Sequence, residues 1–155
     1  METTTNLNDD TLDAVQDLIE INLDSHKGFE TAANQLEASP QLANYFRECG
    51  QERHRFARDL QSVVSVNGEK PERSGTLKGT AHRWWLEIRG AVQSGDEHAV
   101  LAEAERGEDA IKHKYEDVLK STAGSPLNKT LQQQYMEVKR RHDQIRDMRD
   151  ARAGS

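Results

Sequence analysis

Four breaks divide this sequence into long uninterrupted segments, and they constrain the fold more than any other feature. Two are the pairs Ser39-Pro40 and Ser125-Pro126, in which serine can cap a helix and proline suits its first turn. The other two, Asn67-Gly68 and Ser94-Gly95, end helices. The segments between them are rich in Glu, Gln, Ala, Leu, Lys and Arg, which favour helix over strand. We therefore predict an all-α protein.

Five helices follow from these breaks, over residues 9–38, 40–66, 76–93, 97–121 and 126–152. Four of them are long, and the shorter one lies in the polar connection between the second and third long helices. A four-helix bundle with one long crossover has this order of elements, which is the ferritin-like connectivity. At 155 residues the whole chain, 1–155, is expected to form one domain.

Composition limits the partners and the cellular location that we expect for the protein. A formal net charge of −6 disfavours binding to nucleic acid or to an anionic membrane, since both attract basic surfaces. The sequence has no apolar run long enough to span a membrane and no signal peptide at its start. Cys49 is the one cysteine, so no internal disulfide can form. We expect a cytoplasmic protein whose partner is a second copy of the chain or another protein. The sequence indicates no small-molecule substrate.

Helical projection places one ionisable residue inside the apolar stripe of each long helix. A buried charge must be paired or bind a metal, because an isolated one costs several kcal/mol. We therefore predict that these four residues meet in one buried polar layer near the bundle centre. They are His26, Arg53, Glu108 and His142. Further candidates in or near the same stripes are Asn22, Glu30 and Glu105.

The remaining histidines are predicted to be solvated: His54, His82, His98 and His113. The crossover helix has an apolar face that includes Trp84 and Trp85. We predict that this face packs on the outside of the bundle, against small residues around Gly28 of the first helix. The alternative is that the two tryptophans form a contact between subunits.

Four stretches, in this order, resemble a known family: HKGFETAA, SGTLKGTAHRWW, ERGEDAIKHKYEDVL and HDQIRDMRD. They are similar to a bacterial family of ferritin-like four-helix bundles of unknown function, and the resemblance covers nearly the whole chain. It implies the ferritin-like fold, with the tryptophan-bearing segment in the crossover. It implies no established activity.

Di-iron members of the wider ferritin-like superfamily bind metal with a glutamate from each of two helices and a Glu-x-x-His pair from each of the other two. The resemblance places Glu108 and His142 at a glutamate and a histidine of that pattern, and His26 at the first-helix glutamate. The second helix instead presents Arg53, and Lys139 stands three residues before His142, so both Glu-x-x-His pairs are missing. A guanidinium would repel two iron ions. A di-iron oxidoreductase or storage-type protein is therefore only the second alternative.

The favoured hypothesis is a non-catalytic bundle with a binding or stress-associated role, in which Arg53 pairs with Glu108 and the two histidines complete the hydrogen bonds. The first alternative is a single Zn²⁺ or Fe²⁺ ion held by His26, Glu108 and His142. No other cofactor and no catalytic residue is expected. Cys49 is interpreted as a buried structural thiol.

Overall fold

The described part of the protein folds into five α-helices. The computed structural model describes residues 3–73 and 79–152, and the side chains of residues 79–85 are not part of that description. Within it the helices are α1 (Asp9–Gln35), α2 (Pro40–Val66), α3 (Gly79–Ser94), α4 (Glu97–Ser121) and α5 (Asn128–Ala151). The described residues contain no β-strand, only an isolated bridge between Thr3 and Asn6. The all-α prediction is confirmed.

Two predicted helix ends differ from the described ones by two residues or more. The first helix ends at Gln35, because the Leu36 N–H turns back to bond the Ala33 carbonyl at 3.1 Å. The last helix begins at Asn128 and not at 126, because Ser125 Oγ accepts a bond from the Leu127 N–H and closes a turn there. Positions 76–78 of the predicted crossover helix lie outside the described residues.

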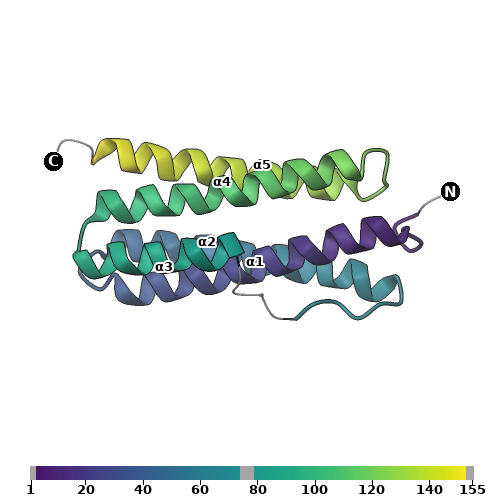
Figure 1. Cartoon of the computed structure of the whole chain (residues 1–155), viewed down its shortest axis with the longest axis horizontal. Helices are drawn as coiled ribbons and strands as arrows, with labels where there is room; N and C mark the ends of the chain where they lie inside the picture. The colour runs from purple at the N-terminus through teal and green to yellow at the C-terminus, as the bar shows by residue number, and fades with distance from the viewer. Residues whose placement is uncertain (1–2, 74–78, 153–155) are drawn as a thin grey trace.

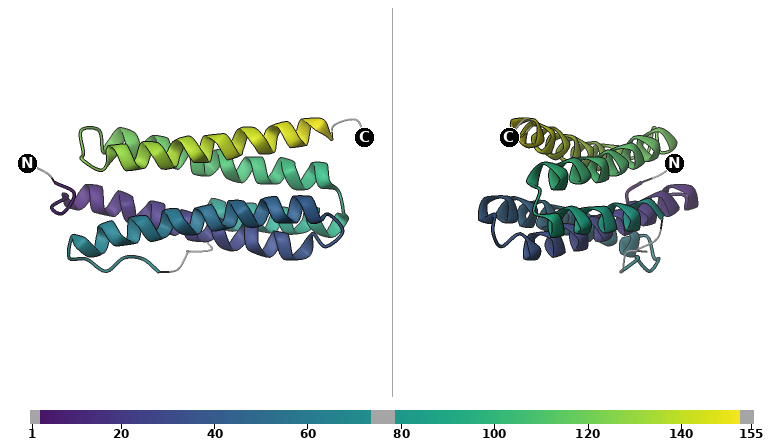
Figure 2. Two further views of the ribbon diagram at one scale, coloured as in Figure 1. Left: turned by 180° about the vertical axis from the view of Figure 1, so that it is seen from behind. Right: turned by 60° about the vertical axis from the view of Figure 1, so that its left-hand side comes forward.

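The helices form two antiparallel hairpins that lie side by side (Figures 1 and 2). One hairpin is α1 with α2, and the other is α4 with α5. Helices α2 and α4 run in the same direction, so the connection between them, residues 67–96, returns along the length of the molecule (Figure 1). That connection carries α3, which packs on α4 and α1.

The hydrophobic core is split into two clusters, one toward each end of the bundle. One cluster gathers Phe29, Phe46 and Leu101 with their neighbours, and the other gathers Leu18, Leu60 and their neighbours. Between them each long helix has a stretch that contributes no fully buried residue to either cluster: 20–28, 50–59, 105–110 and 139–144. These stretches hold most of the buried polar residues: Asn22, Asp24, Ser25, Glu52, Arg53, Glu108, Arg141 and His142.

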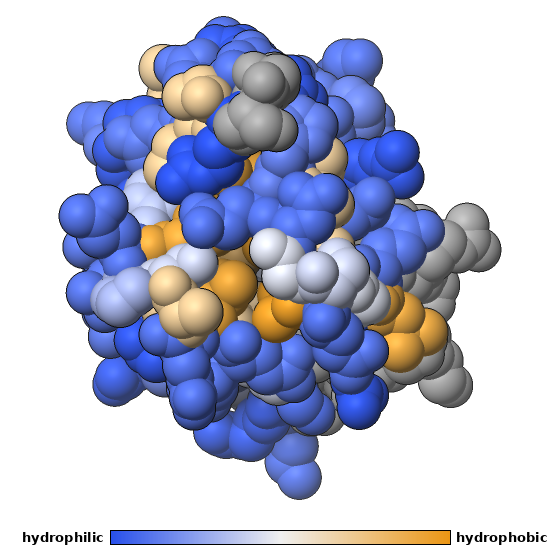
Figure 3. Space-filling model, turned by 90° about the vertical axis from the view of Figure 1, so that its left-hand side faces the viewer, coloured by the Kyte–Doolittle hydropathy of each residue, from blue (hydrophilic) through white to orange (hydrophobic). Residues whose placement is uncertain are grey.

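The surface at one end of the bundle is well solvated. Seen from the end where the α1–α2 turn lies, the surface is mostly hydrophilic, with a few hydrophobic residues visible between the charged ones (Figure 3). No helix in the described part of the chain is long and apolar enough to cross a membrane.

Helix α3 packs outside the two hairpins, against α1 and α4. Its Ile88 is buried, and so are Ser25, Gly28 and Ala32 on α1, the small-residue flank that was predicted to receive it. The predicted roles of Trp84 and Trp85 lie outside the described side chains.

Two glycine substitutions are expected to have opposite effects on stability. Gly124, in the turn between α4 and α5, has φ +86°, a conformation that an L-residue adopts at a cost of about 1–2 kcal/mol. Gly124→Ala should therefore lower the free energy of unfolding by about that amount. Gly90 lies inside α3 with open space where a Cβ would stand, so Gly90→Ala should raise it by roughly 0.5–1 kcal/mol. Urea unfolding followed by circular dichroism measures both, and equal effects of the two variants would contradict the assigned backbone conformations.

Candidate functional site

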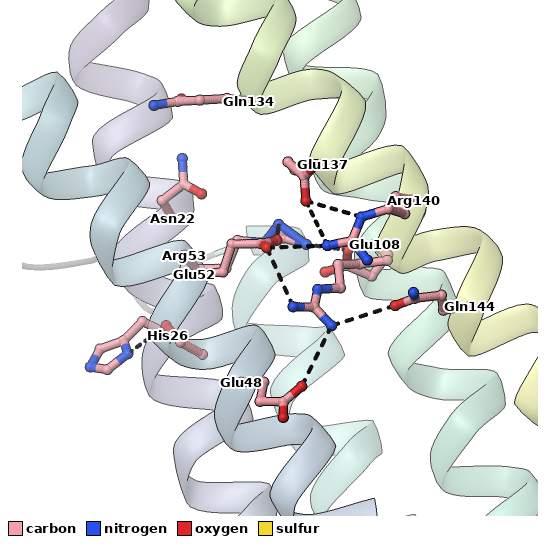
Figure 4. A network of polar contacts seen from close by, with 12 residues as sticks. Asn22, His26, Glu48, Glu52, Arg53, Glu108, Gln134, Glu137, Arg140 and Gln144 are labelled. Atoms are coloured by element: carbon pink, nitrogen blue, oxygen red, sulfur yellow. Dashed lines mark hydrogen bonds and ion pairs between the residues drawn. The ribbon is translucent and has the colours of Figure 1, made fainter.

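The centre of the bundle is occupied by an ion pair between α2 and α4. Arg53 Nη2 lies 2.5 Å from Glu108 Oε2, and both side chains are fully buried (Figure 4). Each residue stands in the middle of its helix, between the two hydrophobic clusters. The structure thus pairs Arg53 with Glu108, the cation and the carboxylate that helical projection predicted to face the core.

Burial and pairing act against each other in this ion pair. Burial raises the pKa of the Glu108 carboxyl, while Arg53 opposes that shift by its charge and its hydrogen bond. Burial alone would lower the pKa of Arg53, but Glu108 and other nearby groups outweigh it, so the pKa of the guanidinium is raised. Because Arg53 keeps its proton, Glu108 must be ionised for the pair to be neutral. Removing either partner would leave an uncompensated charge in an apolar surrounding.

A second ion pair extends the layer toward α5. Buried Glu52, next to Arg53 on α2, has its Oε2 3.8 Å from Arg140 Nη2 (Figure 4). The same oxygen lies 3.4 Å from Arg141 Nη2. Arg141 also stacks on the Tyr45 ring at 5.2 Å. These long side chains connect α2 to α5 across the bundle.

The charged layer is only partly hydrogen-bonded. Within the described residues, Arg53 Nε and Nη1, Glu108 Oε1, Glu52 Oε1 and Arg141 Nε make no hydrogen bond, although all are buried. The closest opposite charges among them, Arg53 Nη1 and Glu52 Oε1, are 4.0 Å apart. A buried donor or acceptor without a partner costs about 1–3 kcal/mol. The layer is therefore held by charge pairing more than by a complete hydrogen-bond network.

A neutral chain of hydrogen bonds lies beside the ion pair and joins three helices. Asn22 Nδ2 on α1 donates to Tyr115 Oη on α4 at 2.8 Å, and Tyr115 in turn donates to Gln134 Oε1 on α5 at 2.8 Å. All three residues are buried. Asn22, a predicted extra member of the layer, is thus hydrogen-bonded to the uncharged side chain of Tyr115.

His142 lies at the edge of the layer, on the α4–α5 seam. Its Nε2 is 2.8 Å from Asp109 Oδ1 and 3.8 Å from Glu105 Oε1, while its Nδ1 is 3.0 Å from Asp143 Oδ1. Glu105 also pairs with Arg149. The predicted members His142 and Glu105 therefore meet each other, in a cluster separate from the Arg53–Glu108 bond.

His26 does not reach the layer, in contrast to the prediction. Its side chain is half-buried and points away from Arg53 and Glu108 (Figure 4). Its Nδ1 lies 2.9 Å from the Gly50 carbonyl oxygen, and its ring lies against His54 with centroids 4.7 Å apart. Helix α1 is buried on two flanks, one of which is the flank around Gly28. The middle of its buried surface is therefore turned away from His26.

The other candidates lie outside the layer. Glu30 is half-buried beside Gly50, where a Cβ on the glycine would come within 3.2 Å of Glu30 Oε1. His54 is half-buried against His26 and not on the open surface as predicted, whereas His113 and His98 are exposed. The side chain of His82 lies outside the described part of the chain.

Helical spacing could have identified three buried polar residues that the sequence analysis did not single out. Glu52 follows Cys49 by three positions and precedes Phe56 by four. Gln134 and Arg141 stand in the same relation to apolar residues of α5, between Leu131, Val138 and Ile145. All three are buried.

Comparison with known proteins identifies a family but no characterised relative. The family model for a domain of unknown function, DUF2383, matches residues 10–121. The match covers nearly all of α1 and the whole of α2, α3 and α4, so it includes Arg53 and Glu108. None of the curated proteins compared with the chain matches it.

A double-mutant cycle should reveal strong coupling between Arg53 and Glu108. Arg53→Met and Glu108→Leu should each lower the free energy of unfolding by about 3–5 kcal/mol, because each leaves one buried charge without its partner. The double variant should lose much less than the sum of the two, since it removes both charges. Urea unfolding of the four proteins gives the coupling energy.

The control for this cycle is the exposed pair Lys114–Asp17, which also joins two helices, at 3.4 Å. Lys114→Ala should change the free energy of unfolding by less than about 1 kcal/mol, because surface ion pairs contribute little. Additive effects of Arg53→Met and Glu108→Leu would mean that the central pair does not act as a unit.

The Cys49 thiol is expected to be unreactive in the native protein. It is fully buried, and burial first and the Glu108 charge second raise the pKa of the thiol to about 12, although Arg53 opposes the shift. Since the thiolate is the reactive form, raising the pKa from about 8.5 lowers the reactive fraction near pH 8 on the order of a thousandfold. Reaction with Ellman's reagent should be negligible for the native protein and rapid in urea. Rapid reaction of the folded protein would contradict this account.

Proposed function

We propose a function for this chain, which belongs to the DUF2383 family of unknown function, from the chemistry of its buried layer. The protein is a non-catalytic bundle of ferritin-like connectivity with a binding or stress-associated role, and an ion-paired layer stands where di-iron members of that superfamily hold metal. The parallel course of α2 and α4, with the long α3-bearing connection between them, supports the connectivity.

One observation carries the proposal: Arg53 fully buried against Glu108 at 2.5 Å. In a ferritin-like di-iron centre, glutamates and histidines from all four long helices converge on the metals. Here the central carboxylate already binds a guanidinium, and that permanent positive charge would repel a divalent ion placed beside it. The residues present do not fit a di-iron centre.

The single-ion alternative with His26, Glu108 and His142 has less geometric support. Glu108 binds Arg53, His26 turns toward His54 and Gly50, and His142 lies against Asp109. Binding one ion with these three residues would require the central ion pair to open and His26 to leave its own contacts.

The layer is also separate from the two open hollows described at the ends of the bundle. One, of about 440 Å³, is lined by residues 121–126 with Asn8 and Thr11. The other, of about 530 Å³, is lined by residues 38–42 with Glu97 and Arg152. A molecule in either hollow would not contact Arg53 or Glu108. This favours a role for the layer in fixing the helices, and a role for the outer surface in binding.

Aerobic oxidation of Fe²⁺ tests the proposal. The wild-type protein should not accelerate the appearance of Fe³⁺ absorbance beyond buffer, because the bundle centre does not bind two ions. The matched comparison is Glu108→Gln, which removes the charge of the carboxylate that pairs with Arg53. Acceleration by the wild type that is lost in Glu108→Gln would overturn the proposal and favour a di-iron oxidoreductase.

A further inference from the structure

We propose that Glu105, Asp109 and His142 bind one zinc ion on the α4–α5 seam. This site is distinct from the central ion pair and uses neither Glu108 nor His26. Glu105 and Asp109 are one turn apart on α4, so their carboxylates point the same way, and His142 faces them from α5. One ligand atom from each of the three residues lies within 4.8 Å of the other two.

The spacing of these atoms suits a tetrahedral ion. Ligand atoms around a tetrahedral zinc, each about 2.0–2.1 Å from the metal, stand about 3.3 Å apart. The His142 Nε2 is 2.8 Å from Asp109 Oδ1 and 3.8 Å from Glu105 Oε1, on either side of that value. Small side-chain rotations would therefore seat the ion without moving either helix.

The carboxylates around the His142 imidazole favour a bound cation. Both ring nitrogens face carboxylate oxygens, Nε2 toward Asp109 and Nδ1 toward Asp143. A neutral imidazole has one N–H and can donate to only one of them. The second contact is favourable only when a proton or a metal ion lies between the nitrogen and the oxygen. An imidazole with carboxylates is a ligand set that zinc accepts and that Mg²⁺ and Ca²⁺, which prefer oxygen alone, do not.

Two neighbours would orient the ligands. Asp143 accepts the hydrogen bond from Nδ1 and so directs the Nε2 lone pair toward α4, which is the carboxylate–histidine–zinc arrangement. Arg149 holds the other oxygen of Glu105, leaving Oε1 turned toward His142. The charge of Arg149 also opposes a bound cation, so it should limit the affinity of the site.

The site is open to solvent on one side. The side chains of His142 and Glu105 are 11% and 14% exposed, whereas that of Asp109 is 42% exposed. Three protein ligands leave the fourth position of a tetrahedral zinc for water. The ion would therefore exchange with solvent, and it would crosslink α4 to α5 beside the central layer.

Titration of the metal-free full chain with Zn²⁺ by calorimetry near neutral pH tests this inference, with Co²⁺ absorption spectra reporting the geometry. One ion per chain is expected, with tetrahedral Co²⁺ bands. Asp109→Asn should weaken binding roughly 10–100-fold and His142→Ala at least as much, while Asp143→Asn should weaken it by roughly tenfold. Zn²⁺ should raise the melting temperature of the wild type more than that of Asp109→Asn, which removes only a half-exposed charge.

Two variants separate this site from its alternatives. Arg149→Gln should tighten Zn²⁺ binding severalfold, because it frees Glu105 and removes a repelling charge. The matched control is His113→Ala, since His113 is exposed on α4 one turn after Asp109, and it should bind as the wild type does. Absence of zinc binding in the wild type, unchanged binding in His142→Ala, or loss in His113→Ala would each overturn the proposal. None of these results depends on Arg53 or on iron oxidation.

Discussion

The buried contact between Arg53 and Glu108 constrains how the rest of the bundle can be arranged. It places a charge from α2 and a charge from α4 at one level, fully out of water. Hydrophobic packing alone tolerates sliding of one helix along another, because apolar contacts are not directional. A buried ion pair tolerates very little, since any shift leaves two desolvated charges apart. We therefore regard the pair as the feature that sets the relative height of the two hairpins.

The split of the core into two clusters agrees with this role. Each cluster packs the four long helices near one end of the molecule, and the polar layer separates them. Around the central pair, α2 meets α5 through long side chains such as Glu52 and Arg141, and α1 meets α4 and α5 through Asn22, Tyr115 and Gln134. Every long helix thus makes a directional contact within the polar layer or next to it. A layer with several unbonded buried atoms adds little net stability, so its contribution is better understood as specificity of arrangement.

The sequence predicted the helices well because their ends are marked by local chemistry. Serine–proline pairs and glycines act within a few residues, so no knowledge of the fold is needed to read them. Arg53 and Glu108 were found because each lies in the stripe of its own helix. His26 satisfied the same criterion, yet the second buried flank of α1 moved the centre of burial away from it. Such a flank depends on where α3 packs, and a projection of α1 alone does not contain that information.

The cluster around His142 shows a different limit of sequence reasoning, and it also explains why a cation would bind there and not in the centre. Asp109 is separated from His142 by about half of α4, a turn and more than half of α5, so only the docking of the two helices brings them together. In the centre, Glu108 and Glu52 each already face a guanidinium, and an added ion would have to displace it. At the seam, Glu105, Asp109 and Asp143 surround one imidazole, while the arginines that face two of them are partly exposed. The uncompensated negative charge therefore lies at the edge of the layer, where an ion can enter from water without losing its whole hydration shell.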